Sequence, residues 1–219
     1  MNEFAKQHLY QRLERTTDAL CLNRMDAHWC KTKEEALALV KTMLPQNAVV
    51  ATGGSMTLEE CGIIDLLRSG AYRYLDREAV APEERGAIYR QAFSADVYLC
   101  SSNAVLESGA LYNVDGNANR VAALTFGPES VIVVAGANKL VATLEDAVAR
   151  VKRVAAPMNT MRLSQDTPCA RCGVCAGIHG EMHKGCQSEQ RICCSYVVNA
   201  WQRIPNRIKV ILVAESLGY

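Results

Sequence analysis

The sequence lacks a long apolar run and lacks an excess of charge of either sign. No stretch of its 219 residues approaches the roughly 20 consecutive apolar residues that a membrane-spanning helix needs. The first 15 residues interleave charged and apolar positions and contain no apolar core of a secretory signal. With 24 basic and 23 acidic residues, the formal net charge is only +1, which argues against a surface built for nucleic acid or an anionic membrane. We therefore expect a cytoplasmic protein without a membrane span or a nucleic-acid partner.

The glycine motifs of nucleotide-binding proteins are also missing. Gly53-Gly54-Ser55 follows a short apolar run and precedes a helical pattern, but the stretch is not GxGxxG and has no Walker lysine. A strand, a glycine-rich turn and a helix start in this order expose backbone N–H groups that can bind a phosphate or a carboxylate. The alternative is a tight turn in which glycine only supplies the backbone conformation.

Cysteine, by contrast, is abundant and clustered. Six of the ten cysteines fall between Cys169 and Cys194. A secreted disulfide scaffold would be short and would carry an export signal, so this clustering favours a metal site. The candidate ligands have spacings typical of iron–sulfur proteins, with three close cysteines and distant further ones: Cys169, Cys172, Cys175, Cys186 and Cys193.

We favour an iron–sulfur cluster, of the 4Fe–4S type, over the other uses of these thiols. Zinc is the alternative, with His179 and His183 as substitutes for a cysteine ligand. Reduced thiols without a metal are the third interpretation. Because six cysteines exceed what one metal needs, Cys172 or Cys194 is left over.

Short apolar runs alternate with helical patterns along the chain. The runs are too short and too β-branched to be helices, and we predict strands at 48–51, 72–75, 97–100, 131–135 and 207–214. Helical spacing predicts helices within 3–15, 32–44, 57–67, 82–93 and 143–154. This alternation predicts an α/β fold, a layered and mainly parallel sheet with helices on both faces. In the last of these helices we expect Arg150, Lys152 and Arg153 to face solvent.

Two segments depart from this alternation. Ala110–Val114 and Val121–Phe126 are predicted to be strands of a hairpin across Asp115-Gly116-Asn117. Residues 158–194 have little apolar periodicity, and strand character returns only at 207–214. We therefore predict one domain over residues 1–219, with the cysteine-rich segment 167–194 as an excursion from its body.

Polar side chains follow the predicted strands, where open α/β sheets bind their ligands. Glu107 is the first catalytic candidate, as a general base or as a nucleophile that forms an acyl anhydride; the alternative is a surface carboxylate that caps a turn. Lys139 would neutralise developing negative charge. The residues predicted to bind a small anion are Gly53, Gly54, Ser55, Asn103, Asn119 and Arg120.

Several motifs in order resemble the LUD domain of lactate-utilisation proteins. They are GGSMTLEECG at 53–62, SSNAVLESGAL at 101–111, GNANRVAAL at 116–124, GPESVIVVAGANKLV at 127–141, RVAAPMN at 153–159 and the tail TPCARCGVC…RIC. The resemblance implies a fold like that of ribose-phosphate isomerases and coenzyme A transferases. It also implies a glutamate nucleophile in the context Glu107-Ser108-Gly109, and cysteines matching Cys169, Cys175, Cys186 and Cys193. Cys172 and Cys194 depart from that pattern, and 176–185 resembles an insertion.

The resemblance implies a part in the oxidation or use of L-lactate or a related small organic acid. The chain would then be a metal-containing or iron–sulfur subunit with a small-anion pocket, and its partners would be other subunits of a lactate-oxidising complex. An acyl- or coenzyme A-transferase activity is implied by the wider fold alone. The alternatives are an electron-transfer or assembly subunit and a zinc-stabilised binding protein without catalysis of its own. The sequence does not give the substrate and leaves a homo-oligomer open.

Overall fold

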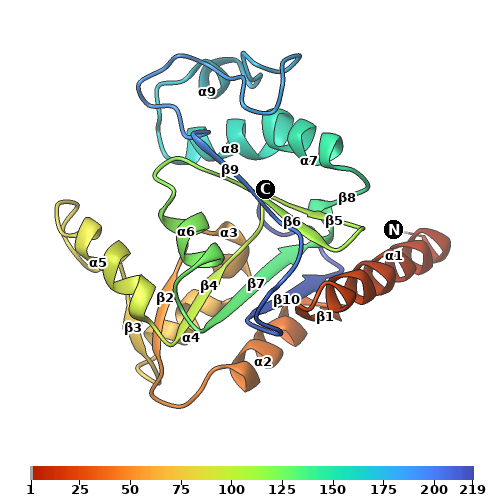
Figure 1. Cartoon of the computed structure of the whole chain (residues 1–219), viewed down its shortest axis with the longest axis vertical. Coiled ribbons are helices and arrows are strands. Elements are labelled where there is room, and N and C mark those ends of the chain that lie inside the picture. Colours follow the sequence, from red (N-terminus) through yellow and green to blue (C-terminus); the bar gives the residue numbers. More distant parts are fainter. Residues whose placement is uncertain (1) are drawn as a thin grey trace.

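The chain folds around a six-stranded sheet in which every pair of neighbouring strands is parallel (Figure 1). The computed structural model describes residues 2–219. In spatial order the strands are β1 (Asp26–Cys30), β10 (Ile208–Val213), β7 (Ser130–Gly136), β4 (Val97–Cys100), β2 (Val49–Thr52) and β3 (Arg73–Leu75). The predicted α/β fold is confirmed, and only β1 was not expected from the sequence. Among the described residues, no helix is both long enough and apolar enough to cross a membrane.

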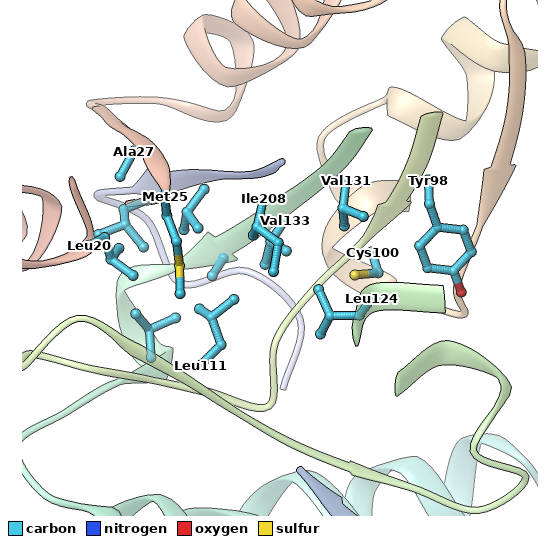
Figure 2. Close-up of a cluster of buried hydrophobic side chains, with 14 of the residues drawn as sticks. Leu20, Met25, Ala27, Tyr98, Cys100, Leu111, Leu124, Val131, Val133 and Ile208 are labelled. Carbon is cyan, nitrogen blue, oxygen red and sulfur yellow. The ribbon is translucent and has the colours of Figure 1, made fainter. Parts of the chain in front are cut away.

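Helices cover both faces of this sheet, and alternate residues of its strands contribute to two apolar clusters. In β4, Tyr98 and Cys100 belong to one cluster, while Val97 and Leu99 belong to the other. Because both faces are buried, the strands read as continuous apolar runs in the sequence. The first cluster, shown in Figure 2, packs against α1 (Glu3–Leu22) and α6 (Asn119–Thr125). The second packs against α2 (Lys33–Met43), α3 (Met56–Glu60) and α4 (Ile63–Arg68). A further helix, α5 (Arg85–Gln91), follows β3.

A second, mixed sheet lies beside the first and corrects the predicted hairpin. Its order is β8 (Leu140–Val141), β5 (Ala104–Leu106), β6 (Ala110–Asp115) and β9 (Ser195–Asn199). The hairpin joins β5 to β6 across Glu107-Ser108-Gly109, whereas residues 119–125 form α6 and not a strand. The Asp115 carboxylate accepts a hydrogen bond from the Val121 backbone N–H at 3.2 Å in the first turn of α6. A short apolar run fits a strand or a helix equally well, which explains the wrong prediction.

A continuous helical run, α7 (Leu144–Arg150), a π-helical turn (Val151–Ala155) and α8 (Ala156–Arg162), packs on the second sheet. The cysteine-rich segment with α9 (Pro168–Cys172) lies on the side of this helical run that faces away from the second sheet (Figure 1). Lys152 in the π-helical turn is not solvated, contrary to the prediction. It is buried, and its Nζ donates to the carbonyl oxygens of Gly177, Gly180 and Glu181 at 2.7–2.9 Å.

Arg150 also departs from the prediction, because its guanidinium is largely withdrawn from solvent. It donates to the carbonyl oxygens of Asn138 at 2.9 Å and Asn103 at 2.6 Å. Burial lowers the pKa of Arg150 to about 10. Arg153 is exposed, as predicted.

Candidate functional site

A cleft of about 480 Å³ opens where three neighbouring strands of the main sheet end. Gly54 and Ser55 follow β2, Ser101 follows β4, and Lys139 follows β7 in a short 3₁₀ turn (Ala137–Lys139). The carboxyl ends of parallel strands are the usual ligand site of open α/β sheets. The predicted site residues that line the cleft are Gly54, Ser55, Asn103, Asn119, Arg120 and Lys139.

The glycine turn after β2 makes room for two arginine side chains. A Cβ on Gly53 would lie 2.9 Å from both Cγ and Cδ of Arg120, and a Cβ on Gly54 would lie 2.7 Å from Nη2 of Arg77. Gly53 itself does not line the cleft, and its N–H donates to the Leu99 carbonyl oxygen within the sheet. The guanidinium of Arg77 therefore lies directly on the turn that was predicted to bind an anion. Sequence reasoning missed Arg77, although it stands two residues after a predicted strand.

Arg120 organises the wall of the cleft with its guanidinium. Its Nη1 donates to the Ser101 carbonyl oxygen at 3.1 Å and to Asn113 Oδ1 at 2.6 Å. Its Nη2 donates to Asn103 Oδ1 at 3.0 Å and to the Val114 carbonyl oxygen at 2.8 Å. Because these donors are already used, Arg120 positions the loops after β4 and β6 and has little left to offer an anion.

Lys139 lies buried at the floor of the cleft between two hydroxyl groups. Its side chain is 3% exposed, and Nζ lies 2.9 Å from Thr57 Oγ1 and 3.0 Å from Ser101 Oγ. Burial, together with the positive charges of Arg150 and Arg120, lowers the pKa of Lys139 to about 7. The amine is therefore partly neutral at neutral pH.

Thr57 and Ser101 are site residues that the sequence analysis did not include. Ser55 is the N-cap of α3, and its Oγ accepts from the Leu58 N–H at 3.3 Å. The Thr57 hydroxyl is thereby free to contact Lys139. The signal for Ser101 was present, because it is the first residue after a predicted strand.

A second, small cavity lies beside the cleft and collects four of the predicted metal ligands. Cys169, Cys175, Cys186 and Cys193 all line it. Burial raises the pKa of the Cys193 thiol to about 12, and the neighbouring thiols of Cys175, Cys169 and Cys186 add to this effect against the opposing charge of Arg191. Four thiols brought together in this way would repel one another as thiolates unless a cation compensated them.

Cys172, by contrast, is exposed and does not line this cavity. Its Sγ lies 3.5 Å from the Val174 carbonyl oxygen. Cys194 is exposed as well, and neither His179 nor His183 lines the cavity. The structure thus separates four thiols that line one cavity from two that do not line it.

Polar groups of the kind found around iron–sulfur clusters lie next to two of the four thiols. The Gly177 N–H donates to Cys175 Sγ at 3.4 Å, and the hydroxyls of Thr167 and Thr160 lie 3.3 and 3.5 Å from Cys169 Sγ. Hydrogen bonds to ligating sulfur atoms are a common feature of such clusters. Within residues 2–219, no three His, Cys, Asp or Glu side chains already stand close enough to hold a metal ion, so the thiols would have to close in on one.

The cleft and the cysteine cavity share a wall. Arg191, Ile192 and Cys193 line both of them, as do Val151 and Ala156 from the helical run.

In a comparison with known families, the LUD domain model matches residues 13–213. The chain belongs to the LUD domain family. The resemblance inferred from the sequence motifs is thereby confirmed.

This LUD domain is also similar to a solved structure. The crystal structure of a DUF162 family protein from Deinococcus radiodurans aligns with a TM-score of 0.53 and 15% sequence identity, over 94% of this chain and 98% of that one. At this identity the likeness shows the fold alone. None of the curated proteins compared with the LUD domain chain matches it.

The structure does not bring Glu107 of the LUD domain to the cleft. Glu107 stands at the turn between β5 and β6, where its Oε1 accepts from Arg12 Nε at 3.0 Å and from Arg12 Nη2 at 2.6 Å. In the same turn, the carbonyl oxygens of Ser108 and Gly109 accept from Asn23 Nδ2 at 3.2 and 2.8 Å. The Glu-Ser-Gly motif therefore attaches α1 to the second sheet, and a catalytic role for Glu107 stays a prediction without support from this geometry.

Replacing Glu107 with Gln tests the two roles against each other. If Glu107 only pairs with Arg12, Glu107→Gln lowers the free energy of unfolding by about 0.5–1 kcal/mol, because the pair is partly exposed, and leaves ligand binding in the cleft unchanged. Thermal unfolding measures the first effect and ligand titration the second. Arg12→Gln is the matched control, and the double variant is expected to be no less stable than either single one. If Glu107→Gln lost ligand binding and Arg12→Gln did not, Glu107 would have a role in the ligand site.

Proposed function

We propose that this LUD domain is an iron–sulfur subunit for the oxidation or use of L-lactate or a related small organic acid. The acid would bind in the cleft, and the cluster would be held by Cys169, Cys175, Cys186 and Cys193. The observation that carries the proposal is the shared wall, because Cys193 lines the small-molecule cleft and the four-thiol cavity at once. A redox group next to a ligand site is the arrangement that electron exchange with a substrate requires.

The charge of the cleft supports an anionic ligand. Its lining has six basic side chains and three acidic ones, namely Arg77, Arg85, Arg120, Arg162, Arg191 and Lys139 against Glu78, Asp115 and Glu189. Glu78 pairs with Arg77 at 3.1 Å and with Arg85 at 2.9 Å, so it holds the two guanidinium groups near each other. Guanidinium groups bind carboxylates through paired hydrogen bonds. The guanidinium groups of Arg77, which packs against Gly54, and of Arg85 are therefore the proposed carboxylate subsite.

Two basic side chains hold the backbone around the four thiols. Lys152 binds the carbonyl oxygens of 177, 180 and 181, which folds the loop between Cys175 and Cys186 over the cavity. Arg191 donates to the carbonyl oxygens of Cys193 at 2.8 Å and Cys186 at 3.2 Å. When bound, the cluster would supply one-electron redox chemistry. The positive charges of Lys152 and Arg191 offset part of the negative charge that thiolate ligands bring.

Anaerobic purification followed by metal and sulfide analysis and a visible spectrum tests this function. We expect a brown protein that contains iron and inorganic sulfide, with broad absorbance that bleaches with dithionite. Titration with L-lactate is expected to perturb that absorbance, because the ligand would lie across one wall from the cluster. A colourless protein with stoichiometric zinc would contradict the proposal and favour a zinc-stabilised binding protein. A brown protein whose spectrum no small organic acid perturbs would leave an electron-transfer subunit.

A further inference from the structure

Three side chains from three different elements meet at the floor of the cleft. Lys139 follows β7, Ser101 follows β4, and Thr57 stands in α3 after β2, and Lys139 Nζ lies 3.0 Å from Ser101 Oγ and 2.9 Å from Thr57 Oγ1. The Thr57 hydroxyl in turn donates to the Leu217 carbonyl oxygen at 3.2 Å. All three residues are less than 10% exposed. Nothing in the proposed redox function uses the Ser101 hydroxyl.

The surroundings of Lys139 are unusual for a buried lysine. Charged groups of this type are normally buried with a carboxylate partner, but the hydrogen-bond partners of Nζ among the described residues are the two hydroxyls. The charged and titratable groups near it are Arg150 from α7, Arg120 from α6, and Glu60 and Cys61 at the end of α3. The two arginines and burial disfavour the ammonium, while Glu60 and Cys61 favour it, and the pKa of Lys139 falls to about 7. A neutral amine 3.0 Å from a serine hydroxyl is able to accept its proton.

Ser101 and Ser102 both line the cleft, and the Ser101 hydroxyl is the one that lies 3.0 Å from Lys139 Nζ. Lys139 and Arg77 of the proposed carboxylate subsite line the same cleft. The hydroxyl of Ser102 is turned away, since it donates to the carbonyl oxygens of Ala104 at 2.8 Å and Tyr112 at 3.2 Å. The strand end thus presents one of two adjacent serine hydroxyls to the amine.

We propose that Ser101 is a nucleophile, with Lys139 as its general base, for acyl transfer from an ester or thioester whose acyl group carries a carboxylate. Serine–lysine pairs of this kind perform acyl transfer on several unrelated folds. Thr57 positions the amine, because its hydroxyl lies 2.9 Å from Nζ and 3.5 Å from Ser101 Oγ. This activity goes beyond the redox function and does not depend on it.

The proposed steps balance in protons and bonds. The neutral Lys139 amine takes the Ser101 hydroxyl proton while Oγ bonds to the acyl carbonyl carbon. The bond from that carbon to the leaving oxygen or sulfur breaks, and the Lys139 ammonium gives its proton to the leaving group. Water then attacks the Ser101 ester and passes a proton to Lys139, and Ser101 Oγ leaves and regains that proton. The products are a carboxylic acid and an alcohol or thiol, and no oxidant or reductant is needed.

Incubation of the purified protein with p-nitrophenyl acetate tests this proposal. We expect a burst of one p-nitrophenolate per chain and an acetyl group that peptide mass mapping locates on Ser101. The acylation rate is expected to rise with pH through about 7, because the amine must lose its proton to act as a base. Ser101→Ala is expected to abolish the burst, and Lys139→Met to slow it by at least about 100-fold.

Ser102→Ala is the matched control and is expected to keep the burst. An acetyl group on Lys139 or on other residues, or a burst that survives in Ser101→Ala, would overturn the proposal. Circular dichroism of each variant shows whether it still folds, and the protein itself must form the adduct, so the proposal does not rest on the variants alone. A protein without iron that still acetylates Ser101 would refute the redox function and leave this inference standing. A brown protein that forms no acetyl adduct would refute this inference and leave the redox function standing.

Discussion

Substituting serine for any one of Cys169, Cys175, Cys186 and Cys193 is expected to remove the iron–sulfur cluster. The four thiols line one cavity, so each would contribute one ligand, and a serine hydroxyl is a poor replacement for a soft thiolate. We expect the iron content and the visible absorbance of each variant to fall to about a tenth of the parent value or less. Metal analysis and the visible spectrum after anaerobic purification measure both.

Cys172→Ser and Cys194→Ser are the controls for this series. Both cysteines are exposed, and Cys172 does not line the cavity, so each variant is expected to keep its iron and its colour. If Cys172→Ser lost the cluster while one of the four other variants retained it, the ligand set would include Cys172 as the spacing in the sequence suggested. That result would contradict the set proposed from the cavity.

Replacing Gly109 with Ala is expected to destabilise the protein by about 3–5 kcal/mol, more than most single substitutions cost. Gly109 has φ +86°, a conformation that costs an alanine roughly 1–2 kcal/mol. Its added Cβ would also clash with the α1 backbone, because it would lie only 2.5 Å from the Ala19 carbonyl carbon. Since backbone cannot swing aside as a flexible side chain can, α1 would have to move off the second sheet. Thermal unfolding is expected to show a Tm lower by roughly 10 °C.

Gly70→Ala separates the two causes of this effect. Gly70 has φ +91°, but a Cβ there would meet nothing within 4 Å. Its substitution therefore reports the cost of the backbone conformation alone, and it is expected to lower the free energy of unfolding by only about 1–2 kcal/mol. If both variants lost the same free energy of unfolding, α1 could move away from the added Cβ at little cost. The close packing of α1 on the Glu-Ser-Gly turn would then contribute little to stability.

The main sheet was predictable because its strands are buried on both faces. Runs such as Val97–Cys100 and Val131–Ala135 are apolar throughout, which distinguishes them from half-exposed strands. The segment Val121–Phe126 was not predictable in this way. Its apolar residues fit either structure, and the choice depends on the Asp115 carboxylate that caps the turn before α6.

Lys152 shows why burial could not be inferred from helical periodicity. On the helix alone it is a polar residue on a polar face, but a loop 25–29 residues further along the chain brings three carbonyl oxygens to its ammonium group. Such a contact arises from tertiary structure, and local sequence carries no signal for it.

The candidate site was predictable only in part, for a related reason. Lys139 was found because it lies in the loop after a buried strand, and the same rule would have found Ser101, which directly follows β4. Glu107 lies outside the cleft because the short strand β5 intervenes between Asn103, which lines the cleft, and Glu107, which contacts α1 instead. The spacing of cysteines pointed to the segment but could not distinguish Cys172 from the four cysteines that line one cavity.

The π-helical turn at Val151–Ala155 sets the rotational phase of everything that follows it in the helix. Removing one residue from this turn would rotate each later side chain about the helix axis by about 100°. The Thr160 hydroxyl would then lose its contact with Cys169 Sγ, and Ala156 would no longer lie between the cleft and the cysteine cavity. The five-residue length of this turn thus fixes the orientation of α8 about its axis. In this orientation one side of α8 faces the thiols and another side faces the cleft.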